Sequence, residues 1–171
     1  SFYEERARGG VSLITVGGFS FSLLGSRYFG QARLKKVSQI DEHRKLTSAI
    51  HKEGAYTLLQ LSHAGADADH FFALNPTTIN KDGARLAWRM PKFLIKSTIK
   101  KVAKTAQLAK MANYDGVELD FAQNHLFNSF ATPGLNHRHD EWGGSELNRT
   151  KLCLQTVQAI REMVGTDFVI S

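Results

Sequence analysis

The segment VSLITVGG at residues 11–18 decides the fold class of this chain. Residues 11–16 form an almost continuous run of apolar and β-branched side chains, which is typical of a strand buried in a parallel sheet. The pair Gly17-Gly18 predicts that this strand ends there and enters a loop. Similar runs follow at residues 56–61, 116–121 and 168–170, so the sequence predicts four strands of one kind.

Amphipathic segments separate these four runs. Apolar residues recur there at helical spacing, and Gly54 and Gly165 mark the ends of two of the predicted helices. The last helix is predicted to be capped by Ser145 and to bury a face formed by Leu154, Val157, Ile160 and Val164. After a short helix over residues 2–8, the order βαβαβαβ predicts a parallel α/β sheet, either open and doubly wound or closed into a barrel.

Two connections are long enough to carry a functional site. About thirty residues separate Leu61 from the next helix, and more than about twenty separate Phe121 from Ser145, whereas most such connections are far shorter. Both follow the carboxyl ends of strands, which is where barrels and open α/β sheets build their active sites. We therefore expect functional side chains in these two loops.

The composition of the chain limits the classes of protein to which it can belong. The chain has 171 residues, of which 42% are hydrophobic and 22% charged, and its single cysteine, Cys153, can form no internal disulfide. It contains no apolar stretch of membrane-spanning length, and charged residues follow closely after Ser1 where a signal peptide would be apolar. These features predict a soluble, cytoplasmic domain with no membrane partner.

The formal charge of +6 is concentrated in one segment. No acidic residue lies between Asp82 and Asp115, whereas lysines repeat every four residues at Lys92, Lys96, Lys100 and Lys104. Such a stripe is typical of the solvated face of a helix. Few aromatic side chains accompany it, so we expect no nucleic-acid partner.

Motifs for common cofactors and nucleophiles are missing from the sequence. The chain has no glycine-rich nucleotide loop, no Cys-x-x-Cys or His-Glu-x-x-His motif and no Gly-x-Ser-x-Gly nucleophile. His137, His139 and Asp140 could ligate a metal, but they lie in a charged loop with no further ligand beside them. We therefore expect no metal site.

Several residues at the predicted strand ends are candidates for a ligand site. Gly17-Gly18 would let a flat ligand approach the backbone, although such pairs more often form a tight turn. Gln60 places an amide inside an apolar strand, where it needs partners and could also meet the polar edge of a heterocycle. His63 follows it, either as a ligand contact or as an ordinary loop residue. Glu118 and Asp120 share one face of the third strand, where buried carboxylates must be paired or neutral.

Four segments carry a resemblance to a known family: FYEERARGGVSLITVGG at residues 2–18, HRKLTSAIHKEGAYTLLQLSHAG at 43–65, AQLAKMANYDGVEL at 106–119 and DEWGGSELNR at 140–149. Over essentially its whole length the chain resembles the Old Yellow Enzyme family, most closely its NADH:flavin oxidoreductase and 2,4-dienoyl-CoA reductase branch. The resemblance implies a (β/α)8 TIM barrel that binds FMN, takes hydride from NADH or NADPH and reduces a small-molecule alkene. Residues 1–171 would then form a single partial FMN-binding TIM-barrel domain, with strands two to five and their helices but without the first strand and the last three.

The resemblance also implies roles for residues at matching positions. Gly18 corresponds to a glycine whose backbone lies beside the flavin, and Gln60 to the amide that hydrogen-bonds the pyrimidine edge of the flavin. His125 stands where the reductase branch has a proton-donating tyrosine, and Asn136 and His137 stand in a substrate-contacting segment. The chain departs from the family pattern at Ala66, Asp120, Gln123 and Gly134.

Two hypotheses from different classes follow. The first is an FMN-dependent NAD(P)H oxidoreductase of the ene-reductase type, in which reduced flavin passes hydride to an activated alkene or dienoyl thioester. His125 would be its catalytic acid, because histidine changes its charge near neutral pH. The family's phosphate-binding strands fall outside the chain, so we expect this activity to be incomplete in the chain by itself. The second hypothesis is a non-catalytic half-barrel, either a remnant or a piece that pairs its open strand edges with a second copy or a separately encoded remainder.

Overall fold

The computed structural model describes residues 2–171, with only the backbone at Lys81, Ala84 and Arg85. The main sheet has four parallel strands in the order β1-β2-β6-β7, which are β1 (Leu13–Ser20), β2 (Tyr56–Ser62), β6 (Gly116–Leu119) and β7 (Val169–Ile170). Parallel neighbours require a crossover between them, and each crossover here contains a helix. The predicted parallel α/β sheet is confirmed.

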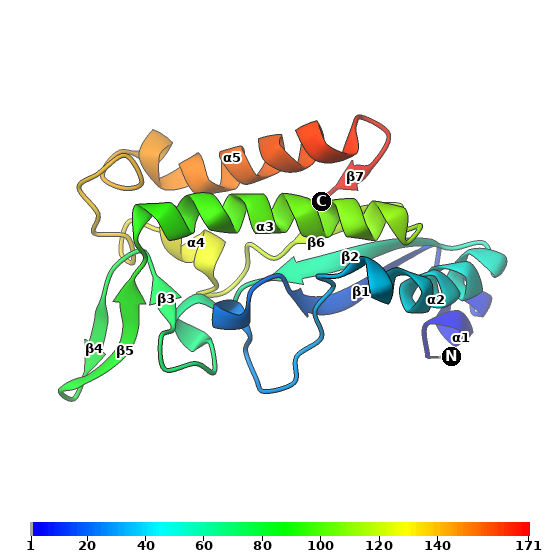
Figure 1. Cartoon of the computed structure of the whole chain (residues 1–171), viewed down its shortest axis with the longest axis horizontal. Coiled ribbons are helices and arrows are strands. Elements are labelled where there is room, and N and C mark those ends of the chain that lie inside the picture. The colour runs from blue at the N-terminus through cyan, green and yellow to red at the C-terminus, as the bar shows by residue number, and fades with distance from the viewer. Residues whose placement is uncertain (1) are drawn as a thin grey trace.

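Five α-helices lie within residues 2–171: α1 (Phe2–Arg8), α2 (Ile40–Lys52), α3 (Lys92–Met111), α4 (Leu126–Ala131) and α5 (Glu146–Val164). Helices α3 and α5 pack side by side along the sheet, and α1 lies against α2 near the other edge (Figure 1).

The sheet has one covered face and one open face. Val16, Leu59 and Val117 lie side by side in the strand register and are buried in a core shared with α3. Side chains alternate along a strand, so the neighbours of these residues point to the opposite face. There the paired residues Leu13 and Tyr56 remain 53% and 65% exposed. Helices therefore cover only one face of the sheet, as they do in a β/α barrel.

Strand β1 continues beyond the point where the sequence predicted its end. It runs through Gly17-Gly18 to Ser20 and contains a bulge, because Val16 pairs with Leu59 and Phe19 with Leu61. The glycine pair is thus an irregularity within a strand rather than a turn after it, and the prediction of a strand end at Gly17 was wrong. A bulge accommodates glycines as readily as a turn does, which is why the composition misled.

Helix α5 begins and ends as predicted, but the face that it buries differs from the predicted face. Ser145 Oγ accepts a hydrogen bond from the Asn148 amide at 3.3 Å, and Gly165 follows the helix with φ 79°. Leu154 and Val157 are exposed, which contradicts their predicted burial. The buried face instead follows a spacing of four, because α5 packs on α3 and α4 through Leu152, Thr156, Ile160 and Val164.

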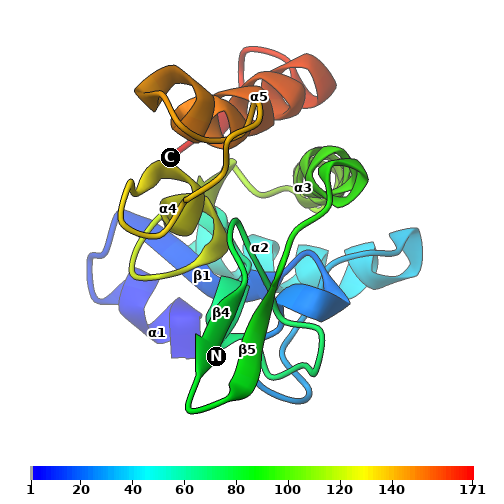
Figure 2. The ribbon, with the colours of Figure 1, turned by 90° about the vertical axis from the view of Figure 1, so that its left-hand side faces the viewer.

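The two long connections contain secondary structure that the sequence analysis missed. The first holds a small second sheet of β3 (Leu74–Asn75), β4 (Ile79–Lys81) and β5 (Ala84–Arg89), in the order β3-β5-β4. Its β4–β5 hairpin projects from the body of the molecule, as the side view shows (Figure 2). The second connection holds the short helix α4. None of the helices described over residues 2–171 is long and apolar enough to cross a membrane.

Candidate functional site

A cavity of about 200 Å³ opens at the carboxyl ends of β1, β2 and β6. The parallel sheet places these three strand ends side by side, so residues far apart in sequence meet there. The cavity brings together Gly18, Gln60 and His125, three of the five predicted site residues. The other side chains and backbone segments that line it belong to Arg27, Tyr28, Gln31, Ser62, Ala64 and Asp120.

The Gln60 amide is held in a fixed orientation. Its Nε2 donates to Glu118 Oε1 at 2.6 Å, and the other oxygen of Glu118 accepts from Thr15 Oγ1 at 3.0 Å. Gln60 Oε1 lies so close to the backbone of Gly17 that a Cβ there would stand 2.6 Å from it. A side chain at position 17 would therefore displace the Gln60 amide from its present position. These contacts leave Gln60 Oε1 and one N–H of Nε2 free of partners within the described residues.

Gln31 fixes the loop that faces this amide. Its Nε2 donates to the Gly18 carbonyl at 2.7 Å and to Ser62 Oγ at 3.4 Å, while its Oε1 accepts from the Arg27 amide at 2.7 Å. The sequence analysis missed Gln31, because it lies in an irregular loop without periodicity or a motif. Only its 8% exposure, unusual for an uncharged polar loop residue, reveals its role once the structure is known.

His125 forms a close pair with Asp120. The Nδ1–H group donates to Asp120 Oδ2 at 2.6 Å, and the two side chains are only 8% and 13% exposed. Asp120 Oδ1 also accepts from the Ala122 amide at 3.1 Å, which holds the carboxylate in place. The Nε2 atom of His125 is buried without a hydrogen-bond partner in the described structure. The ring thus has one nitrogen held by Asp120 and one nitrogen without a protein partner, and histidine is a residue type suited to proton transfer.

His63 lies outside the cavity. Its ring is 1% exposed and packs directly against Gly25, where a Cβ would stand 2.3 Å from ring atoms. Burial lowers the pKa of His63 to about 3, so the ring is neutral and its Nδ1 accepts from the Gly65 amide at 3.1 Å. His63 therefore serves as a buried packing residue, the second of the two readings that the sequence left open.

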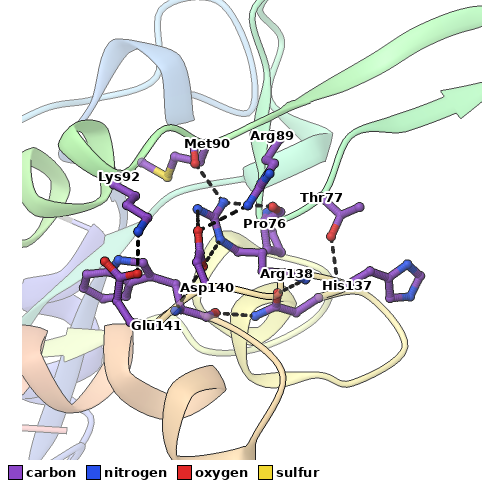
Figure 3. A network of polar contacts seen from close by, with 11 residues as sticks. Pro76, Thr77, Arg89, Met90, Lys92, His137, Arg138, Asp140 and Glu141 are labelled. Carbon is purple, nitrogen blue, oxygen red and sulfur yellow. Dashed lines mark hydrogen bonds and ion pairs between the residues drawn. The ribbon is translucent and has the colours of Figure 1, made fainter.

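Asn136 and His137 are not brought to the cavity. Asn136 is 4% exposed, and its Nδ2 donates to the carbonyls of Phe130 and Trp142 at 2.7 and 2.8 Å. The His137 backbone amide donates to Thr77 Oγ1 at 2.9 Å, while its ring is exposed and points away from the neighbouring polar network (Figure 3). In this structure Asn136 joins α4 to the loop that follows it, His137 joins that loop to the segment between β3 and β4, and neither residue lines the cavity.

Arg138 is the centre of that network (Figure 3). Its Nη1 donates to the carbonyls of Pro76 and Met90 at 3.1 and 2.8 Å, and its Nε and Nη2 donate to the two carboxylate oxygens of Asp140 at 3.0 and 2.8 Å. Burial opposes the charge of Asp140, but the hydrogen bonds from Arg138 and from the Trp142 amide outweigh it and lower the pKa of Asp140 to about 2. Over the described part of the chain, no group of three His, Cys, Asp or Glu side chains is placed to hold a metal ion.

The class of protein follows from the sheet and the position of the cavity. Successive parallel βα units, with helices on one face and a polar cavity at the carboxyl strand ends, define a partial β/α barrel of the enzyme type. The chain belongs to the NADH:flavin oxidoreductase / NADH oxidase family, whose sequence profile matches residues 1–171. This confirms the resemblance to the Old Yellow Enzyme family, whose members bind FMN and use NADH or NADPH. It does not distinguish the 2,4-dienoyl-CoA reductase branch.

Individual relatives match the chain over nearly its whole length. A metal reductase of Desulforamulus reducens is 35% identical over 174 residues, which are 99% of this chain and 26% of the relative. An NADPH dehydrogenase of Bacillus licheniformis is 35% identical over 170 residues, which are 98% of this chain and 50% of the relative. A multifunctional alkene reductase/demethylase of Caballeronia cordobensis is 31% identical over 99% of this chain and 26% of its own length. The chain thus spans a quarter to a half of these curated relatives.

Solved structures show the same partial fold. A 2-naphthoyl-CoA reductase in complex with 2-naphthoyl-CoA superposes with a TM-score of 0.92 at 26% identity, over 99% of this chain and 28% of that one. A morphinone reductase in complex with tetrahydroNAD gives a TM-score of 0.87 at 25% identity, over 99% of this chain and 52% of that one. The predicted partial TIM barrel is therefore confirmed.

Proposed function

We propose that this chain provides the ring-binding and proton-donating part of an FMN-dependent NAD(P)H oxidoreductase that reduces an activated alkene. The observation that supports it most directly is the cavity in which Gln60 and His125 lie together, each with polar atoms free of protein partners. Family membership supplies the cofactor class. The alkene, the activity of the chain by itself and the roles of individual residues belong to the proposal.

The described residues fit one end of FMN. Gln60 presents a free acceptor and a free N–H side by side, which matches the alternating donors and acceptors on the edge of a flavin ring. The absence of a Cβ at Gly17 and Gly18 leaves backbone that a flat ring can approach closely. We propose that Gly18 and Gln60 hold the ring, and that the phosphate is held by a part of the protein beyond these residues.

FMN, when bound, supplies the hydride chemistry that no protein side chain can perform. The protein must add one proton to the alkene carbon that does not receive hydride, and we assign this transfer to His125 Nε2. Asp120 keeps the proton on Nδ1 in place and stabilises the positive ring that has a second proton at Nε2. We propose His125 as the catalytic residue and Asp120 as the positioning residue.

The predicted substrate contacts of Asn136 and His137 remain part of the proposal, although neither lines the cavity described here. For these residues to meet a substrate, the substrate would have to extend from the cavity to the loop that carries Arg138. The expected contact is with His137, because its ring is exposed while the Asn136 amide is fully engaged with backbone.

The proposal is tested by adding FMN to the purified protein and recording its visible spectrum. We expect a bound-flavin band with excess FMN; where the activity is complete, NADH or NADPH bleaches this band and an α,β-unsaturated ketone restores it under anaerobic conditions. A protein that binds no FMN even in excess would contradict catalysis by this chain alone. The same measurement on a mixture with the remaining barrel strands would then show whether the activity returns.

The open sheet supports a second candidate function, an assembling half-barrel without its own activity. Strands β1 and β7 are both edges of the sheet, and the exposed side chains of Leu13, Tyr56 and Val169 lie on or next to these edges. Exposed strand edges pair readily with other strands. Sedimentation that shows a folded monomer at all concentrations would contradict this candidate.

A further inference from the structure

A second cavity, of about 700 Å³, lies on the outer, helix-covered side of the sheet and shares no residue with the candidate site. It is bounded by α3, by α5 and by the segment that follows β1. Its volume is more than three times the 200 Å³ of the candidate site and falls in the range of about 300–1,000 Å³ that is usual for small-molecule sites. Neither the proposed flavin chemistry nor the packing of the core uses it.

The interior of this cavity is apolar. Phe21 and Leu108 form buried parts of its wall, and Ala159 and the half-exposed Met163 approach from α5. Met163 and Ala159 leave apolar surface in contact with water over this buried wall, which favours a ligand that covers it with hydrocarbon. The cavity therefore selects a ligand with an apolar body.

The rim of the cavity is strongly basic. Lys35, Lys100, Lys101 and Lys104 stand around it, while Glu162 is the one acidic side chain that lines it. Lys100 and Lys104 are members of the lysine stripe noted in the sequence, which here borders a hollow rather than a simple solvated face.

Within the described residues, the four rim lysines form no ion pair, unlike three other lysines of the protein. Lys45, Lys92 and Lys110 form ion pairs with Glu42, Glu141 and Asp167 at 2.7, 2.6 and 2.8 Å. Across residues 2–171, no such pair holds any of the rim lysines, and α3 contains no acidic residue. The unpaired positive charge of the helix is thus concentrated where the apolar wall is accessible.

We propose that this cavity, the α3–α5 cavity, binds an amphipathic anion such as a fatty carboxylate. The hydrocarbon chain lies against Phe21, Leu108 and Met163, and the anionic group meets the ammonium groups of Lys100, Lys101 and Lys104. The arrangement does not suit a nucleic-acid strand, because Phe21 is the one aromatic side chain of the lining and is buried.

Dodecanoate is the probe, measured by isothermal titration calorimetry below its micelle concentration. We expect saturable binding of one dodecanoate per chain that weakens as salt is added, because part of the attraction is electrostatic. Dodecanol and dodecyltrimethylammonium carry the same chain without the negative charge and should bind at least about tenfold more weakly. Equal binding of dodecanol would overturn the proposal, since the lysines would then contribute nothing.

Two variants and a matched control locate the site. The triple variant Lys100→Gln/Lys101→Gln/Lys104→Gln should weaken dodecanoate binding by about tenfold or more. Met163→Glu, at a half-exposed position, should do the same by placing an acid beside the chain. The control Lys36→Gln/Lys52→Gln/Lys96→Gln removes the same charge from exposed lysines that do not line the cavity and should bind as the parent does.

A lipid surface is the competing source of the same chemistry. This alternative is tested by measuring co-sedimentation of the protein with vesicles of phosphatidylcholine, with and without phosphatidylglycerol. Binding to anionic vesicles without saturable binding of free dodecanoate would overturn the proposal of a site for single amphipathic anions. An equal loss of dodecanoate binding in the control and the rim variants would also overturn it. Because FMN is absent from every arm, failure of the flavin proposal leaves these results unaffected.

Discussion

Gln60 illustrates how a single side chain of this protein depends on several neighbours. Its amide is oriented by Glu118, and Glu118 in turn by Thr15, while Gly17 leaves the space that Gln60 Oε1 occupies. Gly17, Gln60 and Glu118 are far apart in sequence, and the structure brings them together on three adjacent strands, with Gln60 hydrogen-bonded to Glu118 and in close approach to Gly17. Changes at any of the three should therefore affect the same property.

The first prediction concerns that unit. Gln60→Ala should weaken FMN binding by about 1–3 kcal/mol, because polar groups on the ring edge would lose their partners. Gly17→Ala should have a similar effect, since its Cβ would displace Gln60 Oε1 from a position 2.6 Å away. Gly18→Ala is the milder comparison, with a Cβ 3.3 Å from the same atom. Fluorescence titration with FMN measures all three, and an affinity unchanged in both Gln60→Ala and Gly17→Ala would exclude the proposed ring contact.

The second prediction concerns the His125–Asp120 pair. His125→Phe should slow alkene reduction by about 10²–10⁴-fold, which is the usual contribution of a positioned acid. Reduction of FMN by NADPH should be nearly unchanged, because that step needs no proton from His125. Asp120→Asn should lower the rate of alkene reduction less than His125→Phe does. It should also alter the pH profile of that rate, as expected of a positioning residue. Stopped-flow kinetics measures the reduction of FMN by NADPH separately from the reduction of the alkene. Equal slowing of the two half-reactions in His125→Phe would refute the assigned role.

The third prediction concerns stability in acid. The folded protein keeps His63 neutral with a pKa of about 3, whereas the unfolded chain takes up the proton near the ordinary value of 6.5. Between these two values the unfolded state binds more protons, so the free energy of unfolding should fall by up to about 1.4 kcal/mol for each pH unit below about 6. His63→Asn keeps an acceptor for the Gly65 amide and should reduce this pH dependence. Urea unfolding from pH 7 to pH 4 measures it, with the exposed His137→Asn as the control that should behave as the parent.

At the scale of elements, the β4–β5 hairpin depends on a contact with a distant loop. Arg138 donates to the carbonyls of Pro76 and Met90, which lie just before β4 and just after β5. The arginine thereby satisfies backbone groups at the base of a hairpin that otherwise projects from the body of the protein. Asp140 fixes the arginine from the other side.

The fourth prediction tests this anchor. Arg138→Lys should destabilise the protein by about 3 kcal/mol, because a lysine cannot make the paired contact with Asp140 while also reaching two carbonyls. The β4–β5 hairpin should lose protection from hydrogen exchange before the main sheet does. Arg89→Lys is the control, since Arg89 is largely exposed and forms a single 3.2 Å contact with the same carboxylate. Uniform loss of protection over the whole chain would show that Arg138 does not anchor the hairpin selectively.

The elements also show what the sequence could reveal. The four strands and the helices between them were predictable, because their apolar periodicity is set by burial against one another. The buried face of α5 was not predictable. Leu154 and Leu152 are equally apolar, and only the position of α3 decides which of them is buried. In the site, Gln60 and His125 were predicted from residue type, strand position and resemblance, and the structure brings both to one cavity. The pairing of His125 with Asp120 and the role of Gln31 depend on loop conformation, for which the sequence carries no periodic signal.

At the scale of the whole molecule, the two edges of the four-stranded sheet are the places where further strands can pair. Strand β7 pairs with β6 through the amides of Val169 and Ser171, at 3.0 and 2.9 Å. Hydrogen-bonding groups alternate along a parallel strand, so the Ile170 amide faces the open edge. A chain that joins this edge would engage that amide.

The fifth prediction uses the difference between the paired amides of Val169 and Ser171 and the unpaired amide of Ile170. In a monomer the Ile170 amide should exchange rapidly with solvent deuterium, while those of Val169 and Ser171 exchange more slowly. Protection of Ile170 at high protein concentration, together with faster sedimentation, would indicate that strands pair across the edge. Slow exchange at Ile170 in a proven monomer would contradict the open edge. Measurement of residue-resolved exchange by NMR at two concentrations distinguishes these outcomes.

The bulge at Gly17-Gly18 shifts the phase of the strand's two-residue repeat. Before it, odd-numbered residues such as Thr15 belong to the open face, and after it Phe19 aligns with the buried Leu61 and packs on the core. The loss of one glycine would remove the bulge and restore an unbroken alternation, with Phe19 still on the buried face opposite Leu61. A one-residue gap at this point in an alignment of relatives therefore signifies a strand without the bulge, whose later residues keep the same buried and open faces, and not a shorter loop.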